Sequence, residues 1–423
     1  MPAFLLSNYS SVLREVILPY IQDNFPSQKI TLNQFKKSVD SQVMNNNFHV
    51  PLRTARHGGV TSLANDGNNL NATTGATFSR GSIAVKTHTG AFNISKLAIE
   101  ASSGDRMAIK GAFMAQADSL VSDFSRDLNR QVYGHPSNIV AQIIGSTSGT
   151  EFTVTQPNSA TIDDGTAIDY YGSVNGDLAP VEYLTANMRI GIGTAVALGG
   201  TISSVADGGS GTTGTVYTTA AGTAAYLAND AISILDGSGG GTSAAMDGIR
   251  AALSSTTGTY TYAGVARSTT GWTPQFGSVS EALSLSRMEL AYLRAKKYAQ
   301  EGDKYAIFVN ITLYKKYGDL LTAMRRTVNQ TELVGGWSGL AFEAGAGQVG
   351  VFLDTNVPDG EVVGLDLDSW NLCQVSDMSW VEQGSDNLLR LQNTITYQAA
   401  LVWFANVICR APAANFRETQ KSD

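Results

Sequence analysis

The longest regular pattern of apolar positions lies between Gly104 and Gly134. Within this stretch apolar side chains recur mostly three or four residues apart, as they do on one stripe of a helix, and the other positions are largely polar. The stripe consists of Phe113, Ala117, Leu120, Val121, Phe124, Leu128 and Val132. Glycine is favoured just after a helix ends. The pattern therefore predicts one amphipathic helix about 40 Å long, which buries a single face and frames the sequence on both sides.

The sequence before this helix predicts two parts that cannot fold alone. Residues 1–50 hold helix-like spacing around positions 12–17, a break at Pro19, and a second short helix through 32–39. Residues 51–95 have strand-like ends around an Asn- and Gly-rich middle, which indicates a long β-hairpin. An isolated hairpin is marginally stable in water. We therefore expect the arm and the hairpin to rest on other parts of the chain or on another subunit.

The pattern changes twice after the helix. From 138 to 275 short β-like runs alternate with Gly, Ser, Thr and Asp, which predicts an inserted all-β domain of sandwich or barrel type. Ser278 and Glu281 then have capping-box spacing for a helix that ends near Gly302. The order expected next is a strand at 305–310, a helix at 311–326, two strands within 349–367 and a closing apolar sheet from 371 onward. The fold class predicted is α+β with an all-β insert.

Composition and charge add a second contrast between the insert and the rest. The chain has 423 residues, 43% hydrophobic and 15% charged, which is enough for two or three domains with cores of their own. Residues 131–249 contain one basic and ten acidic residues, a net charge of −9, whereas residues 1–130 contain 13 basic and 9 acidic residues, a net charge of +4. A soluble surface domain explains the acidic insert as well as an electrostatic role does.

The residues that commonly carry chemistry are not arranged for it. The four histidines do not have metal-ligand spacing with each other or with the cysteines. The glycine pairs lack the strand and helix context of a phosphate-binding loop. We therefore expect no enzymatic activity, no metal site and no cofactor. Cys373 and Cys409 lie in apolar runs and are expected to be small core residues in a reducing compartment. No secretory signal is visible, and the apolar run at 399–409 is too short to span a bilayer, so we expect no membrane partner.

The order of parts resembles the major capsid proteins of tailed bacteriophages, the Hong Kong 97-type shell fold that encapsulins share. The compact signature is Phe124-Ser-Arg126-Asp127-Leu-Asn129-Arg130-Gln-Val-Tyr133-Gly134, at the end of the predicted helix. The resemblance implies the following division: an N-terminal arm at 1–50, an E-loop hairpin at 51–95, a peripheral domain with the spine helix at 96–137 and 361–403, the inserted β-domain at 138–275, and an axial domain and tail at 276–360 and 404–423.

The same resemblance implies a function. It is that of a coat protein which self-assembles as hexamers and pentamers into an icosahedral shell around double-stranded DNA, in the host cytoplasm and then in the virion. Expected partners are further copies of the chain, DNA through non-specific contacts, and separate scaffolding, portal and decoration proteins. The acidic insert suits an outward face, and the +4 region suits a shell around a polyanion. Phe124 is expected to anchor the spine helix, and Arg126, Asp127 and Arg130 are expected near subunit contacts.

Some members of this family form Lys–Asn cross-links with the help of a buried carboxylate. Lys86 is the candidate hairpin lysine, but Gln398 stands where the carboxylate would be sought. Without a base the amine is not activated, so we expect no autocatalytic cross-linking.

Two other functions compete with a viral shell. An encapsulin-like compartment would keep the fold and enclose a protein cargo instead of nucleic acid. A secreted β-rich adhesin or carbohydrate-active enzyme would use the Gly- and Thr-rich region. The missing signal peptide and the missing catalytic carboxylates argue against this last interpretation.

Overall fold

A computed structural model gives the structure of the chain. It describes residues 31–38, 43–44, 46–58, 60, 75–96, 106–134, 139–143, 151–155, 189–192, 200–207, 213–218, 231–234, 245–254, 261–267, 269, 272–299, 304–323, 330–332, 338–344, 347–354, 356–357, 360–382, 389–390 and 396–422. The helix expected around 12–17 lies outside these residues.

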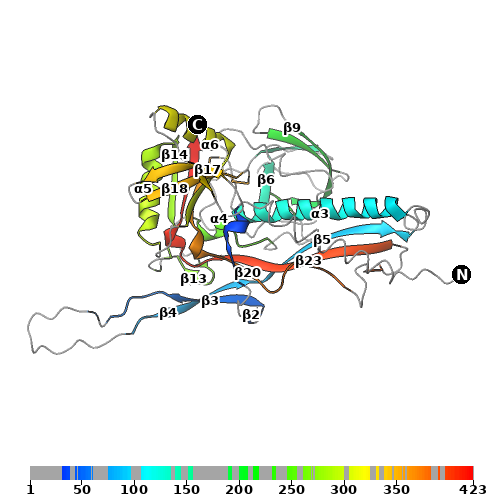
Figure 1. The fold of residues 1–423 in the computed structure, drawn as a ribbon, viewed down its shortest axis with the longest axis horizontal. Coiled ribbons are helices and arrows are strands. Elements are labelled where there is room, and N and C mark those ends of the chain that lie inside the picture. Colours follow the sequence, from blue (N-terminus) through cyan, green and yellow to red (C-terminus); the bar gives the residue numbers. More distant parts are fainter. Residues whose placement is uncertain are drawn as a thin grey trace, which may run out of the picture.

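The predicted long helix is confirmed as α3 (Arg106–Tyr133). It lies along a ribbon of two long antiparallel strands, β5 (Lys86–Ser95) and β23 (Thr396–Cys409) (Figure 1). The other edge of β23 pairs with β20 (Trp370–Gln374), β21 (Ser379–Trp380) and β22 (Leu389–Arg390), and β1 (Lys36–Ser38) adds to β20 in parallel. The helix thus covers one face of a mixed sheet, as its single apolar stripe requires.

A separate small sheet carries the projecting hairpin. It contains β2 (Val43–Met44), β3 (Asn47–Arg53) and β4 (Phe78–Ala84), with β3 in the middle. Figure 1 shows β3 and β4 extending away from the ribbon of β5 and β23. Buried Phe48, Val50, Leu52 and Ile83 attach the hairpin to the main core. The sequence pattern had placed β5 in the hairpin, and this was wrong: β5 pairs with β23, because alternation identifies a strand but not its partner.

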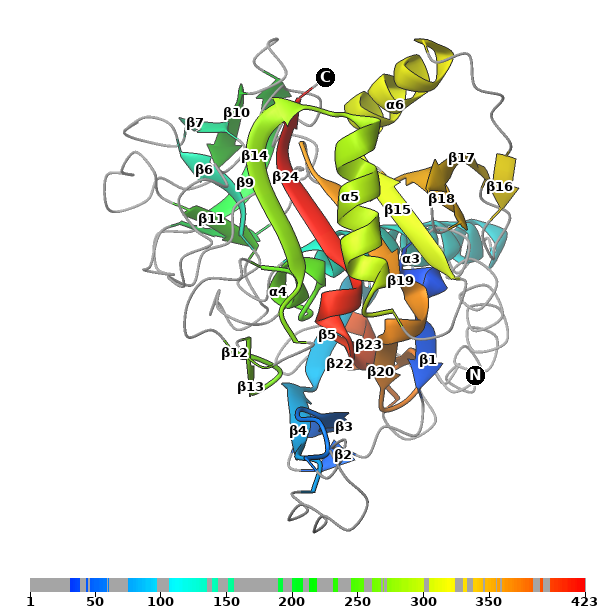
Figure 2. The ribbon, with the colours of Figure 1, turned by 90° about the vertical axis from the view of Figure 1, so that its left-hand side faces the viewer.

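The region predicted as an insert contains a closed barrel of six strands. In spatial order they are β10 (Thr213–Thr218), β7 (Glu151–Thr155), β6 (Ile139–Ile143), β11 (Ala231–Ile234), β8 (Arg189–Ile192) and β9 (Gly200–Asp207). Neighbouring strands are antiparallel throughout. Closure leaves no free sheet edge, so the barrel is a unit of its own. In Figure 2 its strands lie beyond β14 (Gln275–Ala282), on the side away from α5 (Leu285–Lys296).

A seven-stranded mixed sheet forms the second large body. Its order is β14, β24 (Phe416–Ser422), β19 (Val362–Asp366), β15 (Tyr305–Val309), β18 (Gly347–Leu353), β17 (Ser338–Ala344) and β16 (Gln330–Glu332). The helices α5 and α6 (Ile311–Ala323) pack on it through one apolar cluster that includes Tyr292 and Tyr317. The predicted α+β class is confirmed.

Several local predictions need correction. The segment with Ser278 and Glu281 is strand β14, and α5 starts later, with Ser284 as the N-cap that accepts a hydrogen bond from the backbone of Arg287. Pairing with β24 decides this, because a neighbouring strand offers more hydrogen bonds than an exposed first helical turn. The short helix predicted at 32–39 is a 3-10 turn (Leu32–Gln34) followed by β1.

Two strands also depart from the expected domain ranges. β19, inside the range 361–403 expected for the peripheral domain, lies in the seven-stranded sheet. β23 runs past residue 403 as far as Cys409 without a break. The chain passes between the two sheets at the short 3-10 helices Leu367–Ser369 and Pro412–Ala414, so neither crossing coincides with the expected boundaries at 361 and 403. Cys373 and Cys409 are both buried and are not joined in a disulfide, as predicted for core residues.

Candidate assembly frame

The apolar stripe of α3 is seated directly on the backbone of β5. Ala117 and Val121 are buried in a cluster with Leu401, and Phe124 is half-buried and touches both this cluster and the main core. A Cβ added at Gly90 of β5 would lie 3.0 Å from Leu120 and 3.4 Å from Phe124. Helix and strand are therefore in van der Waals contact, and Phe124 joins the two apolar clusters beneath the helix.

The charged residues of the signature organise the last turns of α3. Arg130 donates to one oxygen of Asp127 at 2.8 and 3.0 Å, and Gln131 donates to the other at 2.6 Å. The side chain of Arg130 is 6% exposed and that of Asp127 is 41% exposed. Burial tends to raise the pKa of Asp127, but the charge and hydrogen bonds of Arg130, with the hydrogen bond of Gln131, outweigh it and lower that pKa. Because Asp127 is partly exposed, the pair contributes at most about 1 kcal/mol.

The structure shows where some of the residues expected at subunit contacts lie within the subunit. Arg130 is turned into the subunit and holds the helix end, a role the sequence did not reveal. Arg126 lies within α3, but its side chain is outside the described part of the structure. Lys86 is half-buried at the start of β5, opposite Ala405. Contact of these residues with another subunit stays a prediction.

A buried carboxylate, Asp354, joins three separate parts of the chain. It accepts hydrogen bonds from Thr31 at 2.8 Å, from Tyr133 at 3.2 Å and from Asn129 at 3.3 Å. Thr31 and Tyr133 also share a hydrogen bond with each other. These residues come from the arm, the end of α3 and the loop after β18. We call this group the Asp354 junction, and it explains why Asn129 and Tyr133 stand in the signature.

A second contact region holds the segment that returns from the barrel. Gly248 precedes α4 (Ile249–Ala252) and touches the last carbonyls of α3: an added Cβ would lie 2.4 Å from the oxygen of Val132. Only glycine permits this approach. Asn406 of β23 accepts from the backbone of Asp247 at 2.8 Å and donates to the carbonyl of Ala84 at 2.7 Å. The barrel return, the spine helix and the hairpin root are thus fixed to one another.

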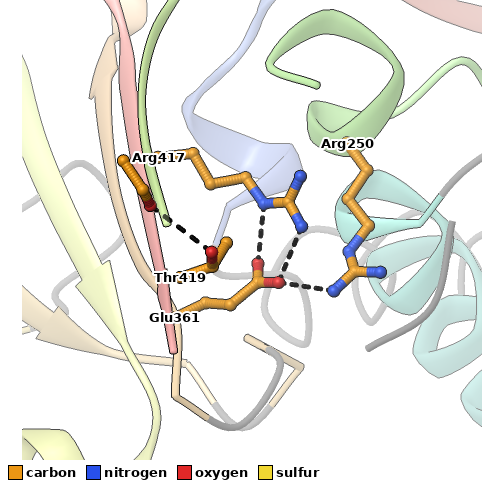
Figure 3. A network of polar contacts seen from close by, with 5 residues as sticks. Arg250, Glu361, Arg417 and Thr419 are labelled. Carbon is orange, nitrogen blue, oxygen red and sulfur yellow. Dashed lines mark hydrogen bonds and ion pairs between the residues drawn. The ribbon is translucent and has the colours of Figure 1, made fainter. Parts of the chain in front are cut away.

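The third contact region is a buried ionic cluster, shown in Figure 3. Glu361 accepts from Arg417 at 3.0 and 2.8 Å and from Arg250 at 2.5 Å. All three side chains are 1% exposed. Burial tends to raise the pKa of Glu361, but the two guanidinium groups outweigh it and lower that pKa. The cluster, called here the Glu361 clamp, ties α4 to the start of β19 and to the C-terminal strand β24.

Sequence reasoning missed the Asp354 junction and the Glu361 clamp. Each partner looks like an isolated polar residue beside an apolar run, and Arg250 stands 111 positions from Glu361. The only signal in the sequence was a charged residue next to an apolar strand, and this does not identify the residue with which the charge pairs. Within the described residues no group of three or more His, Cys, Asp or Glu is placed to hold a metal ion. No helix in the same part of the chain is long and apolar enough to cross a membrane.

The arrangement as a whole defines a class. A long helix on a two-stranded ribbon, a projecting hairpin, a mixed-sheet body and an inserted barrel together form the fold of tailed-phage capsid proteins, as the sequence resemblance implied. The fold of this chain is similar to the folds of subunits in solved capsid structures. A structure of the cyanophage A-1(L) capsid asymmetric unit matches with a TM-score of 0.50 and 11% identity, over 94% of this chain and 92% of that one.

Other matches are more distant. The capsid of a native GTA particle matches with a TM-score of 0.41 and 9% identity, over 93% of this chain and 90% of that one. An encapsulin complex from Synechococcus elongatus matches with a TM-score of 0.28 and 12% identity, over 35% of this chain and 53% of that one. No model of a known protein family and no curated protein matches the sequence.

Proposed function

We propose that this chain is the major coat protein of a tailed phage and assembles into an icosahedral shell around double-stranded DNA. The observation that carries the proposal is the agreement in fold with the cyanophage capsid structure over nearly the whole of both chains. In this function the chain acts by binding copies of itself and performs no catalysis. Its expected assemblies are hexamers and pentamers, formed in the host cytoplasm.

Two features of the subunit support a role in assembly. The hairpin of β3 and β4 extends from the body and exposes Phe78, an aromatic side chain that contact with another subunit would cover. Buried polar contacts also hold the frame described above together. The Asp354 junction and the Glu361 clamp join the arm, the end of α3, the segment that returns from the barrel and the C-terminal strand. A subunit in a closed shell has to keep a fixed shape, because small errors in angle prevent closure.

The distribution of charge along the chain supports the proposed orientation of the subunit in the shell and the proposed DNA content of the shell. The acidic region 131–249 suits a surface turned away from DNA, and the excess of basic residues in 1–130 suits a shell around a polyanion. Contacts with DNA are then non-specific. Scaffolding, portal and decoration proteins are further partners of such a shell.

Expression of the full chain, followed by size-exclusion chromatography and electron microscopy, tests this proposal. Closed shells or capsomers are expected, and a protein that stays a monomer of 44.7 kDa at assembly concentrations refutes it. The nucleic acid in particles from the native source separates a viral shell from an encapsulin-like compartment. Particles that contain a folded protein cargo and no DNA would support the compartment.

A further inference from the structure

The outer face of α5 carries two exposed leucines. Met288 and Tyr292 are buried and hold the helix on the seven-stranded sheet. Leu290 and Leu293 point away from that sheet, and they are 42% and 40% exposed. A single exposed leucine is common on a protein surface, but two in adjacent turns of one helix begin a stripe that a partner would cover.

Basic residues continue this stripe toward the C-terminal end of the helix. Arg294 stands four residues after Leu290, and Lys297 stands four residues after Leu293, so the four side chains share one side of the helix. Both basic side chains are exposed. Tyr298 is 40% exposed, and the ammonium group of Lys297 lies 5.3 Å from the centre of its ring. We call these five residues the α5 patch.

The charge around the α5 patch is opposite to the charge of the barrel region. Residues 285–326 contain nine basic and four acidic residues, a net charge of +5, whereas residues 131–249 have a net charge of −9. Residues 327–423 are acidic as well, but Asp354, Glu361 and Asp366 of that region are buried inside the subunit. Opposite charges on two surfaces favour and orient their association. The barrel region is therefore the acidic part of the chain that best complements the patch.

The barrel and the α5 patch lie on opposite sides of the seven-stranded sheet. In Figure 1, α5 lies at the left edge of this body, and the barrel strands β6 and β9 lie to the right of the sheet. In Figure 2, where α5 faces the viewer, the barrel strands lie beyond the edge strand β14. The barrel of one chain is therefore separated from the α5 patch of the same chain.

A ring of subunits can bring these two sides together. In a cyclic pentamer or hexamer the contact between neighbours is heterologous, so each copy presents one side to one neighbour and the opposite side to the next. The α5 side of one copy can then face the barrel side of its neighbour all the way around the ring. Because the two sides carry opposite charge, this arrangement is favoured over one that places like sides together.

We propose that the α5 patch of one copy binds the acidic barrel region, residues 131–249, of the neighbouring copy in the same ring. Arg294 and Lys297 would face carboxylates of that region, and the two leucines would be covered by the barrel. The inference rests on the proposed shell function and names two surfaces that make one of its subunit contacts. The occupant is a second copy and not DNA, because DNA would satisfy the basic residues but would leave the leucines in water.

Zero-length cross-linking tests which surfaces meet. A carbodiimide joins a lysine amine directly to a carboxylate, so Lys297 in assembled shells should become linked to an aspartate or glutamate within 131–249. Shells assembled from a mixture of isotope-labelled and unlabelled chains should show by mass spectrometry that the two linked peptides come from different copies. In the variant Lys297→Arg, which keeps the charge but lacks the amine, the link should disappear. Links from Lys297 to other regions only, or no link at all, overturn the inference.

Charge reversal in the α5 patch tests whether the contact matters for assembly. Arg294→Glu with Lys297→Glu should lower the yield of shells by about tenfold or more, because like charges would then face each other. The matched control, Lys37→Glu with Lys315→Glu, changes the net charge equally at exposed positions outside the patch and should assemble normally. All four positions are exposed, so the thermal midpoint of the unassembled subunit should stay at the wild-type value. Lysine in place of the cross-linked carboxylates should restore assembly of the charge-reversed chain.

Replacement of the leucines separates a protein partner from DNA. Leu290→Gln with Leu293→Gln keeps every charge and should also lower the yield of shells, whereas a surface that binds DNA would not need the leucines. Normal yield from either this variant or the charge-reversed chain overturns the inference and leaves the shell function standing. Shells that form normally from the charge-reversed chain but lack DNA assign the patch to DNA and overturn the inference equally. If the wild-type protein forms no assembly, the shell function itself fails.

Discussion

Replacement of Glu361 by glutamine removes the charge from the Glu361 clamp and keeps its shape. The carboxylate accepts three hydrogen bonds of 3.0 Å or less from Arg250 and Arg417. All three side chains are 1% exposed, so water cannot replace the lost interaction. Removal of one partner from a buried ion pair costs about 3–5 kcal/mol, because the remaining charges stay buried and uncompensated.

Thermal unfolding measures the effect. With an unfolding entropy of about 2.1 cal/mol/K per residue, each kcal/mol lowers the midpoint of a chain of 423 residues by roughly 1 °C, so the midpoint of Glu361→Gln should fall by about 3–6 °C. The exposed Glu382→Gln is the matched control and should shift it by less than about 2 °C. A triple variant, Glu361→Leu with Arg250→Met and Arg417→Leu, should recover most of the loss, since apolar residues can replace a buried ionic cluster.

The pH dependence of the same pair of proteins supplies a second measurement. The folded pKa of Glu361 is below its ordinary value of 4.5. The clamp therefore stabilises the fold fully above about pH 4.5, and this contribution is lost as pH falls through the lower, folded pKa. The difference in thermal unfolding midpoint between wild type and Glu361→Gln should be constant near neutral pH and should become smaller in acid. A Glu361→Gln midpoint equal to wild type at pH 7 would refute the reasoning.

Three further predictions follow from the frame. Phe124→Asp should abolish soluble shells, whereas the exposed control Ser122→Asp should not; normal shells from the first would show that α3 is not the frame. Gly248→Ala should destabilise the subunit by more than about 2 kcal/mol because its Cβ would overlap the last carbonyls of α3. The control is Gly318→Ala in α6, where an added Cβ would meet no atom outside its own helix turn within 4 Å. This change should stabilise the subunit by roughly 0.5–1 kcal/mol in urea unfolding. Mature shells should run as single chains in denaturing electrophoresis, and a covalent ladder would contradict the absence of cross-linking.

Local patterns were sufficient where one element buries one face. The stripe of α3 predicted the helix and its end at Gly134 because a 3.6-residue period leaves few alternatives. The helical spacing of 311–326 predicted α6 for the same reason, and the short continuous apolar run at 305–310 predicted β15. The turn-rich texture of 138–275 predicted an all-β unit, although it did not distinguish a sandwich from the closed barrel that forms.

Local patterns failed where pairing across the chain decided the outcome. Ser278 and Glu281 have the spacing of a capping box, but β24, more than 130 residues later, draws this segment into a strand. β5 has the alternation of a hairpin strand, but β23 is its partner. Charge and spacing suggested a surface role for Arg130, and only the folded chain shows that its side chain is buried.

The sequence by itself determined the order of parts, the class of fold and the long helix at its centre, because each follows from local periodicity and turn chemistry. Only the tertiary structure decided which polar residues become fixed points. Thr31, Tyr133 and Asp354 meet in one junction, and Arg250, Glu361 and Arg417 meet in another. Burial makes such contacts strong, and burial is a property of the assembled chain: no stretch of sequence carries it until distant strands have paired around it.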